Sequence, residues 1–90
     1  MPQAVVNPEE LERFSQQLQH FSDRLKQQTA ILNAGFSQLG STWRDQEHQK
    51  FAHEYQQTMQ VINKFIDTTD AHVPFLLRKA KRVRDYLNQA

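Results

Sequence analysis

The chain has 90 residues, of which 38% are hydrophobic and 23% are charged, and its formal net charge is +1. These values are ordinary for one small soluble domain, but so short a chain buries only about 60 to 65% of its unfolded surface, so a partner or a second copy would add stability. Cysteine is absent, which excludes a disulfide scaffold, a thiolate metal site and a cysteine nucleophile.

The first ten residues, MPQAVVNPEE, lack the basic and apolar regions of a secretory signal. No apolar run elsewhere approaches the roughly 18 to 20 residues that span a bilayer. We therefore expect a protein that is made in the cytoplasm. Export by a route independent of a signal peptide stays open.

A first helix is predicted from about residue 8 to residue 39. Asn7 is its expected N-cap and Pro8 its first residue. Two glutamates follow, where anions complement the positive end of the helix dipole. Apolar residues then recur in steps of three and four, which predicts a seam facing another helix. This seam comprises Leu11, Phe14, Leu18, Phe21, Leu25, Leu32 and Leu39, with Gln28 and Gly35 as its two non-apolar positions.

A turn is predicted at residues 40–42, because the helical pattern stops at Gly40. Thr42 and Asp45 have the spacing of a capping box, in which the threonine oxygen and the aspartate carboxylate satisfy free amides of the next helix. A second helix is therefore predicted from about residue 43 to residue 72. Its start carries Trp43, the single tryptophan of the chain.

The second helix carries a seam of its own in steps of three and four. Its members are Phe51, Tyr55, Thr58, Ile62, Phe65 and Thr69, followed after a second step of four by Val73. Pro74 comes next, and proline disfavours a helical conformation in the residue before it. We predict a break near residues 72–73 and a separate C-terminal helix at about residues 74–89.

Two helices of about 48 Å and about 45 Å, joined by a short connection, predict an all-α antiparallel hairpin. This hairpin would form a single domain over residues 1–90, with a helical extension after Pro74. Further apolar residues widen the stripe beyond what one facing helix can cover, namely Ile31, Phe36, Met59, Val61 and Ile66. A second hairpin would cover them in a four-helix bundle, as a homodimer or a heterodimer. The alternative is a monomeric three-helix bundle closed by residues 74–90.

The turn carries a specific pattern, in which Trp43 is followed by Asp45, by Phe51 eight positions after the tryptophan, and by Tyr55. In this respect the chain resembles the WXG family, the small ESAT-like helical hairpins of type VII secretion. The family has a Trp-x-Gly turn followed by an aromatic residue at about that distance, so Trp43 and Phe51 carry over. Asp45 replaces the family's glycine. An acidic residue is a good cap at this position, and nothing there requires a positive φ.

The resemblance implies a non-enzymatic protein that is a secreted substrate or a secretion partner and acts through helix–helix contacts. The implied partners are a related helical hairpin, the secretion machinery or a larger effector. The family's C-terminal Tyr-x-x-x-Asp/Glu element is absent, since Tyr86 is followed four residues later by Ala90. A looser spacing of the family is met once, by Ile66, Asp70, Val73 and Leu77, and it includes Pro74.

Catalytic and metal-binding patterns are not found in the sequence. His53 and Glu54 begin like the zinc-protease motif H-E-x-x-H, but Gln57 stands where the second histidine ligand is needed. The remaining histidines, His20, His48 and His72, are separated by helix-scale distances, and we expect no cluster of carboxylates to converge on them. We predict no enzymatic activity, no cofactor and no metal.

The charge is unevenly distributed. Residues 1–74 carry six Lys or Arg against nine Asp or Glu, whereas the last sixteen residues carry five cations against Asp85 alone. The five cations are Arg78, Lys79, Lys81, Arg82 and Arg84. We rank a solvated helical face first, the acidic surface of a protein partner second, and the phosphates of nucleic acid or anionic lipid third.

A subunit of a helical-hairpin filament is a further alternative for a chain of this kind. The tryptophan at the turn favours the WXG pattern over it.

Overall fold

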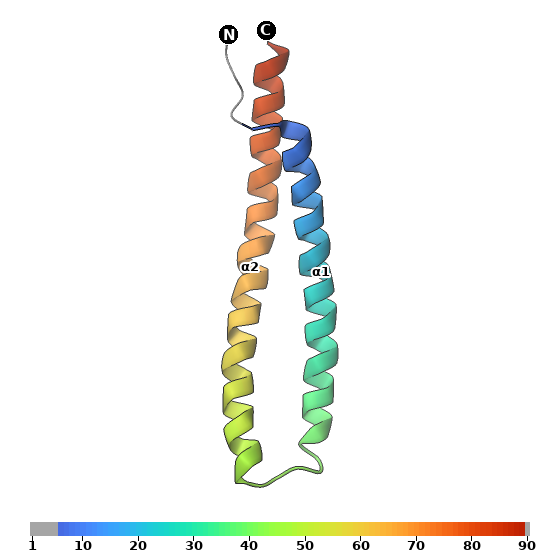
Figure 1. Ribbon diagram of the computed structural model, residues 1–90, viewed down its shortest axis with the longest axis vertical. Helices are drawn as coiled ribbons and strands as arrows, with labels where there is room; N and C mark the ends of the chain where they lie inside the picture. Colours follow the sequence, from blue (N-terminus) through green and yellow to red (C-terminus); the bar gives the residue numbers. More distant parts are fainter. Residues whose placement is uncertain (1–5, 90) are drawn as a thin grey trace.

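The computed structural model describes residues 6–89, and within this range it consists of two α-helices joined by a short loop (Figure 1). Helix α1 spans Pro8–Leu39 and helix α2 spans Gln46–Asn88. The helices lie side by side and antiparallel, and the molecule measures 68 × 17 × 13 Å. The predicted all-α hairpin is confirmed.

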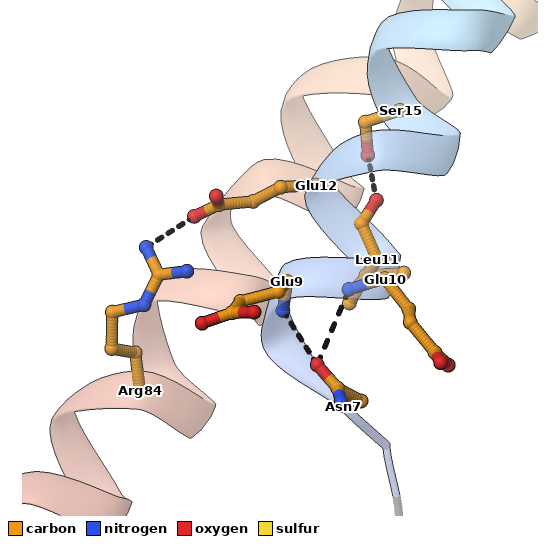
Figure 2. Close-up of polar contacts among 7 residues, drawn as sticks. All are labelled: Asn7, Glu9, Glu10, Leu11, Glu12, Ser15 and Arg84. Atoms are coloured by element: carbon orange, nitrogen blue, oxygen red, sulfur yellow. Dashed lines mark hydrogen bonds and ion pairs between the residues drawn. The ribbon is translucent and has the colours of Figure 1, made fainter.

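The start of α1 is fixed by the cap that the sequence indicates. The Asn7 side-chain oxygen accepts hydrogen bonds from the backbone amides of Glu9 and Glu10, at 2.9 and 3.2 Å (Figure 2). Pro8 occupies the first turn, where its missing amide hydrogen costs no helical hydrogen bond. The bounds of α1 are those predicted from the sequence.

The start of α2 differs from the prediction. Thr42 is not its N-cap, because the Thr42 hydroxyl donates back to the carbonyl of Leu39 at 3.2 Å. Asp45 is the N-cap instead, with extended backbone and a carboxylate that accepts from the amide of His48 at 3.0 Å. The helix therefore begins at Gln46, and the turn takes in residues 40–45.

The predicted break at residues 72–73 is wrong, and so is the separate helix at 74–89. Helix α2 is continuous for 43 residues and includes Pro74. Buried Val73 and Ala80 pack on the side that faces α1, so packing continues on both sides of the proline. Pro74 itself is exposed. Water can therefore hydrogen-bond the backbone carbonyl one turn earlier, which has lost its helical donor.

The seam between the helices is made largely of small side chains. Its buried members are Ser15, Ser22 and Thr29 of α1 and Ile66, Thr69, Val73 and Ala80 of α2. The serine hydroxyls have partners within the protein: Ser15 donates to the carbonyl of Leu11 at 2.8 Å, and Ser22 to the carboxylate of Asp70 at 2.7 Å. These hydrogen bonds let polar groups occupy positions between helices without a large desolvation cost.

The large apolar residues of the predicted seam divide into two groups. Half-buried positions along the seam hold Leu11, Leu18, Leu25, Tyr55 and Ile62. Exposed positions beside the seam hold the other large members, namely Phe14, Phe21, Leu32, Leu39, Phe51 and Phe65. The irregular second step of four in the predicted seam of α2, between Thr69 and Val73, arises because the prediction places Phe65 in the seam. The seam of α2 runs through Ile66, one residue after Phe65, and reaches Val73 in regular steps of three and four.

Replacing Pro74 by alanine tests whether packing holds α2 together across the proline. The Pro74→Ala variant should be more stable than the wild-type chain by about 1 to 3 kcal/mol, because it restores a helical hydrogen bond and removes a steric conflict. Urea unfolding followed by circular dichroism measures this difference. At another exposed position of the same helix, Ala71→Gly should instead destabilise the chain by about 1 kcal/mol. A destabilised Pro74→Ala variant would contradict our account of the helix.

Candidate functional site

Aromatic rings gather where the hairpin turns. Trp43 lies against His48 in a T-shaped arrangement with ring centroids 5.0 Å apart, and it lies 5.9 Å from Phe51. The two members of the family-like pattern, Trp43 and Phe51, are therefore in contact range. Pairs of this geometry contribute roughly 0.5 to 1.5 kcal/mol beyond the area they bury.

Phe36 is the centre of this cluster. The sequence alone did not indicate this role for Phe36. Its ring stacks on Tyr55 at 4.2 Å and on His48 at 5.7 Å, and it lies 5.9 Å from Phe51. Phe36 belongs to the last turn of α1 and His48 to the first turn of α2. Because the end of one helix faces the start of the next across a short turn, these two positions could have been paired from the predicted hairpin alone.

Asp45, two residues after Trp43, is the N-cap of α2. Its φ of −87° is one that any residue adopts, so the backbone at this position does not need glycine. No described residue in the range 6–89 has a positive φ. The carboxylate also places a negative charge at the positive end of the helix dipole.

One side of the hairpin presents several exposed large apolar side chains, which we call the apolar face. It comprises Phe14, Phe21, Leu32 and Leu39 of α1 and Phe51 and Phe65 of α2, each between 43% and 54% exposed. The rings of Phe21 and Phe65 meet edge to face at 6.0 Å, which joins the two helices' contributions into one surface. Exposed apolar side chains that gather on one side of a small protein are typical of interaction sites.

The opposite side of the seam is polar, and we call it the polar flank. Lys26 and Asp70 each lie five residues, about 140° around the helix, from Phe21 and Phe65 respectively. The Lys26 ammonium contacts the Asp70 carboxylate at 2.7 Å. The Asp70 carboxylate also accepts the hydrogen bond from Ser22, so a buried hydroxyl of α1 is tied to this pair.

Two further contacts join the helices along their length. The Tyr55 hydroxyl donates to the side-chain oxygen of Asn33 near the turn. At the other end of the hairpin, Arg84 forms an ion pair with Glu12 (Figure 2). Figure 2 shows this ion pair one turn beyond the Asn7 cap, linking the start of α1 to the C-terminal part of α2.

These polar contacts shift the pKa values of their members. The Lys26 ammonium, with the Ser22 hydroxyl, holds the pKa of the Asp70 carboxyl below its usual value. Asp70 in turn raises the pKa of Lys26. Glu12 raises the pKa of Arg84. Each shift favours the charged form, so the ion pairs persist across the neutral range.

The basic residues near the C-terminus do not all have the same surroundings. Arg84 is partly buried and paired with Glu12, whereas Arg78, Lys79, Lys81 and Arg82 are exposed. The looser family spacing formed by Ile66, Asp70, Val73 and Leu77 lies elsewhere on α2. Three of its four residues make contacts between the helices. Ile66 and Val73 are buried in the seam, and Asp70 is paired with Lys26.

Residues 6–89 contain no group of three or more His, Asp or Glu side chains that could hold a metal ion. The side chains of His53 and Gln57 approach each other at 3.2 Å one helical turn apart, in place of a pair of histidine ligands. Neither described helix combines the length and the apolar character needed to cross a membrane.

Comparisons with known proteins agree with this architecture. The family model named WXG100, for proteins of 100 residues with WXG, matches residues 3–86. The crystal structure of EsxB, a secreted protein of Bacillus anthracis, superposes with a TM-score of 0.80 at 25% sequence identity, covering 94% of this chain and 91% of that chain. A mutant of the same protein gives a TM-score of 0.75 at 25% identity, with coverage of 94% and 98%. Among curated proteins, none matches the chain in sequence.

The Lys26–Asp70 pair makes stability depend on pH in a defined direction. Because the pKa of Asp70 is lowered on folding, its carboxylate stabilises the fold above about pH 3.9, the ordinary aspartate pKa, and this contribution is lost as the pH falls through the folded-state pKa. The wild-type chain should therefore have a higher unfolding midpoint than Asp70→Asn at pH 7, and the difference should shrink below about pH 3.9. Glu54→Gln removes an exposed carboxylate of the same helix that shifts the pKa of neither Lys26 nor Asp70, and it is the control. Parallel pH profiles for wild type and Asp70→Asn would contradict this assignment.

Proposed function

The chain belongs to the WXG100 family, and we propose that it is a secreted, non-enzymatic member that works by pairing its hairpin with a second helical hairpin. Secretion is supported by the similarity to EsxB, which is described as a secreted protein. Pairing is supported by the apolar face. The aromatic cluster at the turn is the second surface available for contacts with a secretion partner or an effector.

The apolar face is the observation that carries the proposal. Within the described chain only Ile66, Val73 and Ala80 are buried apolar residues, whereas the six residues of the apolar face remain about half exposed. Covering a half-exposed phenylalanine is worth about 1 kcal/mol, and the face contains four of them. A single hairpin therefore leaves large apolar side chains that a partner could cover.

The apolar face fits a second copy of the same chain. Positions 14, 21, 28 and 35 of α1 recur every seven residues and hold Phe, Phe, Gln and Gly. Positions 51, 58 and 65 of α2 hold Phe, Thr and Phe with the same spacing. Neither row carries a formal charge, so two such faces meet without repulsion between like charges. The expected assembly is a four-helix bundle.

Solution mass measured by light scattering on a sizing column, over a series of concentrations, tests the pairing. The wild-type chain should have a mass of about twice 10.6 kDa. Phe21→Ser should shift the equilibrium to the monomer, because it places a hydroxyl in the centre of the apolar face. Phe75→Ser is the matched control, since Phe75 is 52% exposed against 53% for Phe21 but lies on the outer side of α2.

The outcomes of the mass measurement separate the alternatives. A wild-type monomer at all concentrations would overturn self-pairing and indicate a heterodimer or a closed monomer. Masses that continue to rise with concentration would favour a filament subunit. Equal effects of Phe21→Ser and Phe75→Ser would show that the apolar face has no special part in pairing.

The aromatic cluster is assigned to engagement of a secretion partner, and Trp43→Ala tests this role. The helices should stay intact, because α2 is capped by Asp45 and the tryptophan is in the turn. Export of the tagged chain into the medium of a host with a type VII secretion system should fall at least about tenfold, the size of effect expected from losing an aromatic hot spot. A cytoplasmic protein in the same culture controls for lysis. Undiminished export of Trp43→Ala would show that the Trp43 ring is not needed to engage a secretion partner.

A further inference from the structure

We infer that the outer side of α2 near its C-terminus docks into an apolar groove with an acidic rim on another protein. The surface comprises Phe75, Arg78, Arg82 and Tyr86, which we call the outer stripe. These residues follow one another in steps of three, four and four, so they form a line along the helix about 16 Å long. All four are exposed.

The outer stripe faces away from α1. Ala80 is 0% exposed and marks the side of α2 that packs on α1. Arg78 and Arg82 each lie two residues from Ala80, and positions two apart are nearly opposite on a helix. Phe75 has the same relation to Val73, which is 7% exposed. Figure 1 also shows the C-terminal end of α2 projecting beyond the start of α1, so the last part of the helix extends past its neighbour.

Charge indicates the chemistry of the partner. Within residues 6–89, Arg78, Lys79 and Arg82 have no ion-pair partner, in contrast to Arg84, which is paired with Glu12. Asp85 is the single acidic residue after position 74. A complementary surface must therefore supply carboxylates of its own. The two rings, 52% and 49% exposed, require apolar recesses in addition.

The order of residues along the stripe favours a protein groove over a membrane or a nucleic acid. The arginines lie between the rings, so inserting both rings into a bilayer would carry the charges toward hydrocarbon. Rings about 16 Å apart on a rigid helix cannot stack on successive bases, which are about 3.4 Å apart in a stacked strand. Arginine and tyrosine are enriched at protein hot spots, and a helix that presents anchors at i, i+3, i+7 and i+11 fits a groove.

This surface is independent of the proposed pairing. A second hairpin on the apolar face would leave the outer side of α2 uncovered. Solution mass tests the pairing, and a binding titration tests the outer stripe, so the failure of one does not imply the failure of the other.

The test uses the full chain and a fluorescent acidic probe peptide, about three heptads long, with a leucine stripe bordered by glutamates. Fluorescence anisotropy at about 0.15 M salt limits the contribution of distant charges. The wild-type chain should bind the peptide. The double variant Arg78→Glu/Arg82→Glu should weaken binding at least about tenfold, and Phe75→Ser/Tyr86→Ser should do so at unchanged net charge.

The matched control is Arg13→Glu/Arg24→Glu, which makes the same change in net charge through exposed arginines of α1. It should weaken binding by less than about threefold. Circular dichroism and solution mass confirm that each variant keeps the wild-type fold and assembly. Absence of wild-type binding, or equal weakening by the control and stripe variants, would overturn the inference. Binding that depends on the outer stripe but prefers phosphatidylglycerol vesicles or a single-stranded oligonucleotide to the peptide would also overturn it.

Discussion

The small-residue seam between α1 and α2 is the constraint on which the rest of the structure depends. Ser15, Ser22 and Thr29 occupy the buried positions of α1, and Thr69 and Ala80 are among their counterparts on α2. Side chains of this size fill the space between the helices at these positions, and they leave no place for phenyl rings. The rings therefore lie beside the seam, where they form a surface instead of a core.

The two sides of the hairpin therefore differ in the contacts that they make. On the polar flank, the Lys26–Asp70 pair and the Ser22 hydroxyl bind the helices to each other at one register. Such a contact specifies an alignment more than it adds stability, since exposed ion pairs contribute little free energy. On the other side, Phe21 and Phe65 touch each other and remain about half exposed. The hairpin thus has polar contacts between its helices on one side and exposed apolar side chains on the other.

The turn between the helices brings together Trp43 and Phe51, the two residues that resemble the family pattern. Asp45 begins α2 by accepting the His48 amide, and the helix places Phe51 beside Trp43. A glycine in place of Asp45 could not supply this side-chain cap. Phe36 brings the end of α1 into the same cluster. The aromatic contacts therefore hold the ends of both helices together across the loop.

The sequence by itself determined the number and direction of the long helices and the N-cap at Asn7, because caps and hydrophobic periodicity are local properties. Tertiary structure alone decided that α2 continues through Pro74, since packing on both sides outweighs a local preference for a break. It also decided which apolar positions are covered. Phe65 and Ile66 are adjacent and both apolar, and only the fit of the facing helix determines which of them is buried.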